Sequence, residues 1–140
     1  VVQVIPTAEH ALRELDSGDL STLSYGEAKE HYPEVIVEGK TLEEAQIPNS
    51  ETYAEMHHRV ASAINRIIKQ SPNQQIVCIT HGGPVVAYLR AAMGYAPEQQ
   101  RKPRFQCRPA SIHHLQMDLE GERTVVALND VAHLTGLPDR

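Results

Sequence analysis

The four residues THGG at positions 80–83 could perform chemistry, because they combine an imidazole with two glycines where an apolar segment, residues 76–79, meets a predicted helix. Glycines leave backbone N–H groups uncovered, and the dipole of a helix start favours an anion. An imidazole at that place can donate to a phosphoryl oxygen and stabilise the charge that develops during phosphoryl transfer. Alternatively, the glycines only form a tight turn and His81 caps a polar group. The motif alone leaves both interpretations open.

Glu14 is the second candidate, because it stands between apolar residues in a predicted loop over residues 12–18. A carboxyl group that is partly buried has a raised pKa, which suits it to hand a proton to a leaving oxygen. Most glutamates in loops are solvated, so the alternative is an ordinary surface charge.

Metal and serine-hydrolase chemistry are disfavoured by spacing. Two histidine pairs occur at positions 57–58 and 113–114, and adjacent side chains on a helix or strand point in different directions. Cys78 and Cys107 are isolated, no His-Glu-x-x-His spacing occurs, and no Gly-x-Ser-x-Gly sequence is present. We therefore predict no metal and no other cofactor.

Composition narrows the class of protein further. The chain of 140 residues suits one domain, and 13 basic against 18 acidic residues give a net charge of −5. There is no basic stripe for nucleic acid, and no apolar run approaches the ~18 residues that span a bilayer. Two cysteines are too few for a disulfide framework, which predicts a cytoplasmic protein with buried thiols.

Sequence patterns predict three helices that frame these residues. Capping boxes at Ser24/Glu27 and Thr52/Glu55 open a short helix ending near residues 31–33 and a longer helix ending near Gln70. A third helix is predicted over residues 84–93, with Pro84 at its first position and a glycine cap at residue 94. The longer helix carries one apolar stripe, formed by Met56, Val60, Ala63, Ile64 and Ile67.

Strands are predicted on either side of the long helix. Residues 1–5 and 76–80 are rich in β-branched residues, and the second run reads as a strand covered on both faces, as in a parallel sheet. Residues 115–119 and 124–128 alternate around Glu120-Gly121 and predict a hairpin. The order of these elements predicts a layered α/β domain.

Several segments, in order along the chain, resemble histidine phosphatases of the phosphoglycerate-mutase-like kind (branch 1). They are LRELDSG at 12–18, LSYGEAKEHYPE at 23–34, SET at 50–52 with RV at 59–60, IVCITHGG at 76–83, and ASI at 110–112 with LNDVAHL at 128–134. The resemblance implies a three-layer α/β/α sandwich with a mostly parallel central sheet. It also implies a small phosphorylated substrate and a phosphoryl group that passes to a histidine and then to water, without a metal.

Carried onto this chain, the resemblance assigns three roles. Glu14 would be the general acid and base for the leaving oxygen, His81 would stabilise the transferring phosphoryl group, and the amide of Gly82 would add a hydrogen-bond donor to the phosphate pocket. The nucleophile of the family lies in an Arg-His-Gly triplet, which does not occur in these 140 residues.

A strand, a helix and a link that carry this triplet would need on the order of fifty residues before Val1. We therefore interpret residues 1–140 as the C-terminal two-thirds of such a domain, incomplete at the N-terminus, and expect this chain to be inactive alone. A mutase would differ only in the acceptor of the phosphoryl group. The alternative is a non-catalytic protein that binds a phosphorylated ligand or a protein partner. Without a strand beside residues 76–80, apolar sheet edges would be unpaired, which predicts self-association.

Overall fold

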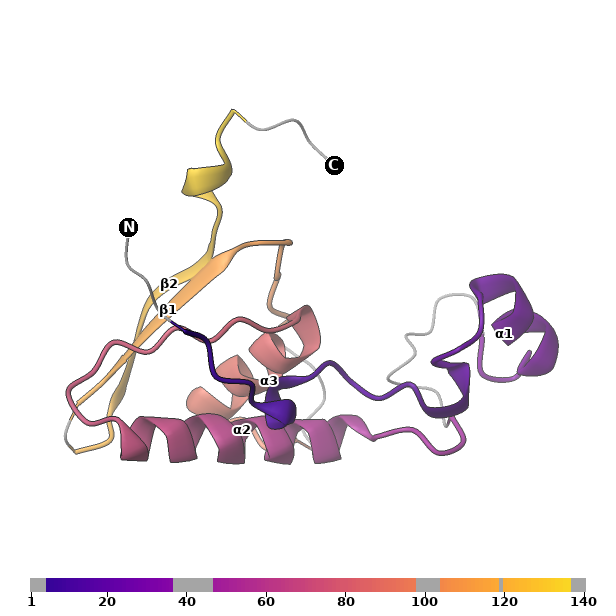
Figure 1. Ribbon diagram of the computed structural model, residues 1–140, viewed down its shortest axis with the longest axis horizontal. Coiled ribbons are helices and arrows are strands. Elements are labelled where there is room, and N and C mark those ends of the chain that lie inside the picture. Colours follow the sequence, from indigo (N-terminus) through magenta and orange to yellow (C-terminus); the bar gives the residue numbers. More distant parts are fainter. Residues whose placement is uncertain (1–4, 37–46, 98–103, 119, 137–140) are drawn as a thin grey trace.

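The computed structural model describes residues 5–36, 47–97, 104–118 and 120–136, and these form an elongated molecule with the long helix along one side (Figure 1). Helix α3 and the short 3-10 helix η1 pack against α2, the β1–β2 hairpin lies at one end, and α1 lies at the other. Their bounds are η1 His10–Leu12, α1 Tyr25–His31, α2 Tyr53–Gln70, α3 Gly82–Ala92, β1 Ile112–Met117 and β2 Arg123–Asp130, with short 3-10 turns at η2 Gly18–Leu20 and η4 Ala132–Leu134.

Both predicted capping boxes are confirmed. The hydroxyl of Ser24 accepts from the Glu27 N–H at 3.3 Å, and the Glu27 carboxylate accepts from the Ser24 N–H at 2.8 Å. Thr52 and Glu55 repeat this exchange at the start of α2, at 3.2 and 2.7 Å. Each box satisfies two of the N–H groups that a helix start leaves without a partner inside the helix, which is why α1 and α2 begin where the sequence indicated.

Helix α3 begins two residues earlier than predicted, so Pro84 occupies its third position and not its first. A proline fits there for the same reason, because the first N–H groups of a helix have no partner inside it. The other end follows the prediction. Gly94 has a φ of +79°, and the N–H groups of Gly94 and Tyr95 donate to the carbonyls of Ala91 and Arg90, which is the Schellman arrangement.

The predicted hairpin is confirmed, although β1 begins earlier and ends earlier than predicted and β2 extends beyond both of its predicted ends. β1 and β2 pair antiparallel, with Leu115 opposite Val125, and the register shifts on both sides of His114. At the turn Gly121 has a φ of +87°, and the N–H of Glu122 donates to the carboxylate of Asp118 at 2.8 Å. A positive φ costs glycine little, so the turn closes without strain.

Two separate apolar cores hold these elements. The first lies between α2, α3 and η1, and Ile68 packs against it where Ile67 was expected to. The second holds α1 and the turn η2 against neighbouring loops. The first consists of Leu12, Met56, Val60, Ala63, Ala87 and Tyr88, and the second of Leu20, Ala28, Val35 and Ile47.

The predicted strand at residues 76–80 is wrong for this structure. The segment is extended, but within the described residues the sheet has only two strands, β1 and β2. Val77 is 79% exposed and Ile79 is 89% exposed, so this run is not covered on both faces. A strand needs a neighbour for its backbone hydrogen bonds, and no described segment pairs here. Of the strand predicted at residues 1–5, positions 1–4 lie outside the described residues.

The expectation of buried thiols is also wrong. Cys78 lies in the uncovered extended run and is exposed, and Cys107 is half-buried. Among the described helices, none is long and apolar enough to cross a membrane.

We expect the uncovered run to mediate self-association of this chain, because exposed β-prone residues with unpaired backbone groups invite pairing with other chains. Replacing Val77 and Ile79 by lysine should shift the population toward monomer, and it should leave the melting temperature nearly unchanged because both side chains are exposed. Analytical ultracentrifugation over a concentration series checks this. A wild-type chain that stays monomeric at high concentration would contradict it.

Candidate active site

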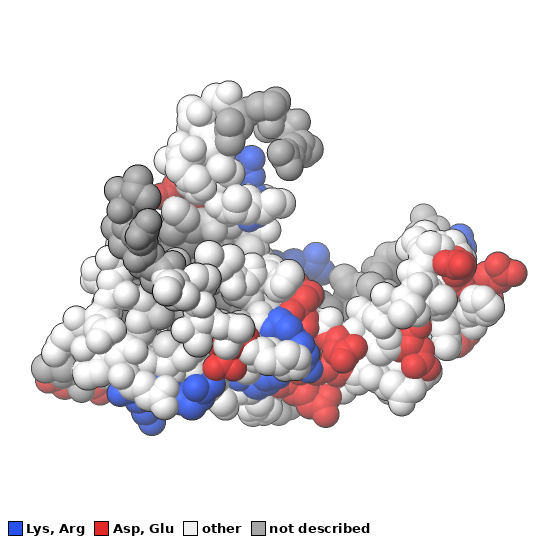
Figure 2. Space-filling model, in the orientation of Figure 1, with Lys and Arg blue, Asp and Glu red and all other residues white. Residues whose placement is uncertain are grey.

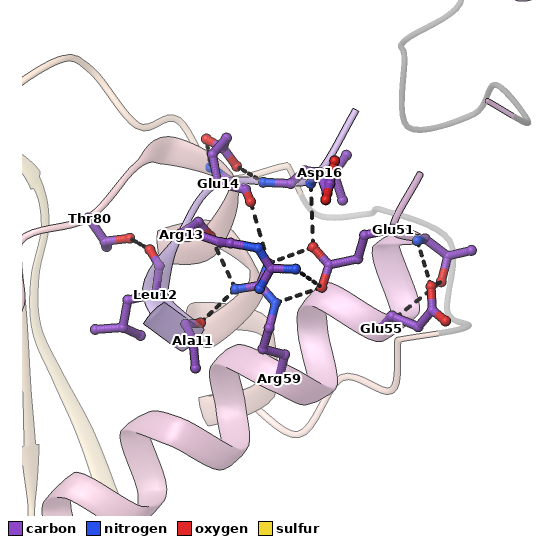
Figure 3. Close-up of polar contacts among 12 residues, drawn as sticks. Ala11, Leu12, Arg13, Glu14, Asp16, Glu51, Glu55, Arg59 and Thr80 are labelled. Carbon is purple, nitrogen blue, oxygen red and sulfur yellow. Dashed lines mark hydrogen bonds and ion pairs between the residues drawn. The ribbon is translucent and has the colours of Figure 1, made fainter. Parts of the chain in front are cut away.

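The loop that carries Glu14 is held by the guanidinium group of Arg59, which lies on α2 (Figure 3). One terminal nitrogen of Arg59 donates to the carbonyl of Ala11 at 2.6 Å and to that of Arg13 at 3.2 Å. The other terminal nitrogen lies 3.5 Å from the carbonyl of Glu14. The carbonyls of Ala11 at the end of η1 and of Arg13 and Glu14 in the loop after it need donors, and one arginine donates to all three.

The carboxylate of Glu51 completes this arrangement. It accepts from Nε and a terminal nitrogen of Arg59, each at 2.6 Å, in a bidentate ion pair. The backbone N–H of Glu51 also donates to the carbonyl of Asp16 at 3.0 Å. A terminal nitrogen of Arg13 lies 3.7 Å from the Glu51 carboxylate. We name Arg59 and Glu51 the anchor pair. Such planar two-bond pairs fix geometry as well as charge.

The anchor pair shifts the titration of its acid. Burial by itself would raise the pKa of Glu51, but the hydrogen bonds and charge of Arg59, with a smaller contribution from Arg13, outweigh it and hold the pKa of Glu51 below 4.5. The Glu51 side chain is only 10% exposed, so solvent screens the pair weakly.

The segment before His81 is tied to the same loop. The hydroxyl of Thr80 donates to the carbonyl of Leu12, a residue of the first core. Because Leu12 is two residues before Glu14 and Thr80 is one residue before His81, this bond brings the two predicted site residues to the same end of α3.

The Glu14 carboxylate lies against the first turn of α3. Its Oε2 accepts from the N–H of Gly83 at 3.2 Å, and its Oε1 accepts from the N–H of Leu15 at 2.8 Å. A side chain at position 83 would collide with it, because an added Cβ would stand 2.1 Å from Oε1. Glu14 is nevertheless exposed, so the partial burial expected from its apolar neighbours is wrong. Leu15 packs on the first core while the carboxylate turns out toward α3.

His81 is the N-cap residue of α3, its side chain is exposed, and it makes no capping hydrogen bond. Neither Gly82 nor Gly83 has a positive φ, so the tight-turn interpretation of the two glycines does not hold. Pro84 offers no N–H, and the N–H of Val85 donates to the carbonyl of His81. Within the described part of the chain, the structure therefore brings His81, Gly82 and Glu14 together at one helix start.

The surface charge around the site differs from the surface charge at the α1 end of the molecule. Figure 2 shows acidic side chains gathered over α1, whereas basic and acidic side chains lie next to one another over the part of α2 that is nearer to α1. An anion therefore meets less repulsion at the centre of the molecule than at α1. No group of three metal-ligating side chains is assembled in the residues that the structure describes.

Sequence reasoning noticed Glu51 and Arg59 only as part of a resemblance and gave them no role. The spacing of the two residues along the sequence could have indicated that they form an ion pair. Glu51 precedes the N-cap Thr52, and Arg59 lies two turns into α2, so the two side chains can meet beside the first turns of the helix. What they hold, the loop at residues 11–14, could not be identified from spacing along one helix.

The chain belongs to the histidine phosphatase superfamily (branch 1), whose sequence model it matches over residues 2–131. This confirms the resemblance found in the sequence. Membership implies an α/β fold and phosphatase- or mutase-like activity on small phosphorylated substrates. None of the curated proteins compared with the chain matches it.

We expect the contribution of the anchor pair to the free energy of unfolding to depend on pH. Because the pKa of Glu51 is lowered on folding, its contribution is complete well above pH 4.5, the ordinary value, and is lost as the pH falls through its folded value. Replacing Glu51 by glutamine should lower the free energy of unfolding by about 2 kcal/mol at neutral pH, typical of hydrogen bonds to a charged group.

The difference between wild type and Glu51→Gln should shrink as the pH falls below 4.5. Urea unfolding followed by circular dichroism at a series of pH values measures it. Glu30→Gln is the matched control, because Glu30 is an exposed residue on α1. A difference that grows on acidification would be inconsistent with the anchor pair.

Proposed function

We propose that this chain is the acid-bearing and phosphate-binding part of a phosphatase that acts through a phosphohistidine. His81 and the Gly82 amide receive the phosphoryl group, and Glu14 protonates the leaving oxygen. The observation that supports this most is the 3.2 Å hydrogen bond from the Gly83 N–H to Glu14, because it holds a carboxylate at the helix start where His81 is the N-cap residue. The central, mostly parallel sheet of a three-layer sandwich belongs to the same proposal.

The helix start supplies the electrostatics of the site. Its dipole and the Gly82 N–H favour a phosphate, and His81 can donate to an equatorial oxygen as charge develops. Glu14, held at the same helix start by the Gly83 N–H, would hand a proton to the leaving oxygen of a phosphate bound there.

The nucleophile is the remaining part. The sequence contains no Arg-His-Gly triplet, so we propose that the attacking histidine comes from a segment encoded before Val1. His81 is a poor substitute, because a site that aims another histidine in line with the leaving oxygen does not aim His81 there. The absence of the triplet from this sequence is also what favours the second candidate function, a non-catalytic protein that binds a phosphorylated ligand or a protein partner.

Activity separates the two candidates. The 140-residue chain should neither hydrolyse p-nitrophenyl phosphate nor acquire acid-labile phosphate, and an extension carrying the encoded residues before Val1 should do both. In the extended chain, His81→Ala should lower the rate by on the order of a hundredfold, as for loss of one donor to a developing charge. His31→Ala, an exposed position on α1, is the matched control and should retain the rate.

Two outcomes would change the assignment. Turnover by the 140 residues alone that is lost in His81→Ala would indicate a different nucleophile. Phosphate binding without turnover in either chain would support the non-catalytic candidate.

The close contact at Gly83 provides a sharper test of Glu14. In the extended chain, Gly83→Ala should displace the carboxylate and slow hydrolysis of an alkyl phosphate, which needs an acid, by about tenfold or more. Hydrolysis of p-nitrophenyl phosphate, whose leaving group needs little protonation, should fall much less. Gly82→Ala should preserve the ratio of the two rates, because a Cβ at position 82 does not meet Glu14. Equal ratios in both variants would show that Glu14 does not act from this position.

A further inference from the structure

The thiol of Cys107 lies near the same helix start. It lies in the connector of residues 104–111 that leads to β1, and its Sγ stands 4.0 Å from the position that a Cβ on Gly82 would occupy. Glu14 lies against Gly83 and Cys107 lies against Gly82. Side chains from two distant segments therefore flank consecutive residues of the first turn of α3.

A series of polar contacts holds the thiol there. The Sγ of Cys107 is 3.8 Å from the hydroxyl of Ser111, and that hydroxyl is 3.2 Å from Nε2 of His113. The backbone N–H of Asn129 donates to Nδ1 of His113 at 3.3 Å. We name Cys107, Ser111 and His113 the thiol relay.

The direction of the relay follows from the last of these bonds. Because Nδ1 of His113 accepts, a neutral ring carries its hydrogen on Nε2 and donates it to the Ser111 oxygen. Burial lowers the pKa of His113, which favours the neutral ring. The hydroxyl hydrogen of Ser111 is then left to donate toward Sγ of Cys107. Asn129 also accepts from the N–H of Arg108 at 2.7 Å, so the connector is fixed to β2 next to the thiol.

We propose that Cys107 lines the phosphate site and contacts the bound phosphate group, and that Ser111 and His113 are positioning residues for its thiol. This rests on the proposed function, because it takes the start of α3 to be the phosphate site. The thiol is small, uncharged and only a weak hydrogen-bond donor. It would therefore limit the size of a group that binds beside Gly82 without adding a charge to the site.

Thiol alkylation tests the proposal without requiring turnover. The 140-residue chain is treated with iodoacetamide, and mass spectrometry follows Cys107 and Cys78 separately, the latter being an exposed internal control. At a phosphate concentration ten times its measured Kd, alkylation of Cys107 should slow about tenfold by simple occupancy, and alkylation of Cys78 should not change. Sodium chloride at equal ionic strength controls for screening.

Binding of inorganic phosphate is measured independently by 31P NMR with wild type and His81→Ala. If phosphate binds and depends on His81 while Cys107 alkylates at its unprotected rate, the inference fails and the proposed function stands. If phosphate does not bind at all, both are overturned. Equal slowing of both cysteines would mean a general effect of phosphate and would also overturn the inference.

The relay has its own readout. The 15N shifts of the His113 ring should show a hydrogen on Nε2 at neutral pH. Ser111→Ala should reduce the protection of Cys107 by phosphate to less than about half, because the thiol loses its anchor. Ser62→Ala, an exposed position on α2, should retain the protection. A hydrogen on Nδ1, or full protection in Ser111→Ala, would overturn the positioning role.

Discussion

The carbonyl oxygens of Ala11, Arg13 and Glu14 accept no hydrogen bond from another backbone group in the described part of the chain, and the guanidinium group of Arg59 supplies a donor to each of them. This is the constraint on which the site depends. Glu51 holds the other side of Arg59 in a bidentate pair and so orients the guanidinium group toward those carbonyls. The loop is fixed to the first turns of α2, and Glu14 is thereby presented to α3. A lysine could not replace Arg59, since a single ammonium group lacks the planar set of donors that serves a carboxylate and a chain of carbonyls together.

Local chemistry made the helices and the hairpin predictable. Ser24 and Thr52 begin α1 and α2, and Gly94 and Gly121 mark a helix end and a turn, because each acts on neighbours within a few residues. The strand predicted at residues 76–80 does not form, and the reason is not local. The β-branched residues of this segment favour an extended backbone, but a strand also needs a partner for its hydrogen bonds, and no described segment supplies one. The exposure of Val77 and Cys78 follows from the same missing neighbour.

The site was only partly readable for a related reason. His81 and Gly82 lie in one motif, so their joint position at a helix start could be predicted from the sequence. That Glu14 lies at the same helix start depends on two contacts between distant segments, Thr80 with Leu12 and Gly83 with Glu14. Its exposure was misjudged because apolar neighbours in sequence can bury their own side chains and still direct a carboxylate outward, as Leu15 does here.

Gly82 and Gly83 are adjacent in one motif, but a different reason explains the glycine at each position. Both adopt a backbone that any residue could adopt, so conformational freedom does not explain either of them. A glycine at position 83 leaves room for the Glu14 carboxylate, because that carboxylate occupies the volume that a side chain at position 83 would need. The neighbours of Gly82 would allow a side chain at that position, since a Cβ there would meet only Cys107 at an ordinary contact distance. A glycine at position 82 is explained if something small and anionic must approach its N–H closely, which is the purpose that a phosphate site at this helix start gives it.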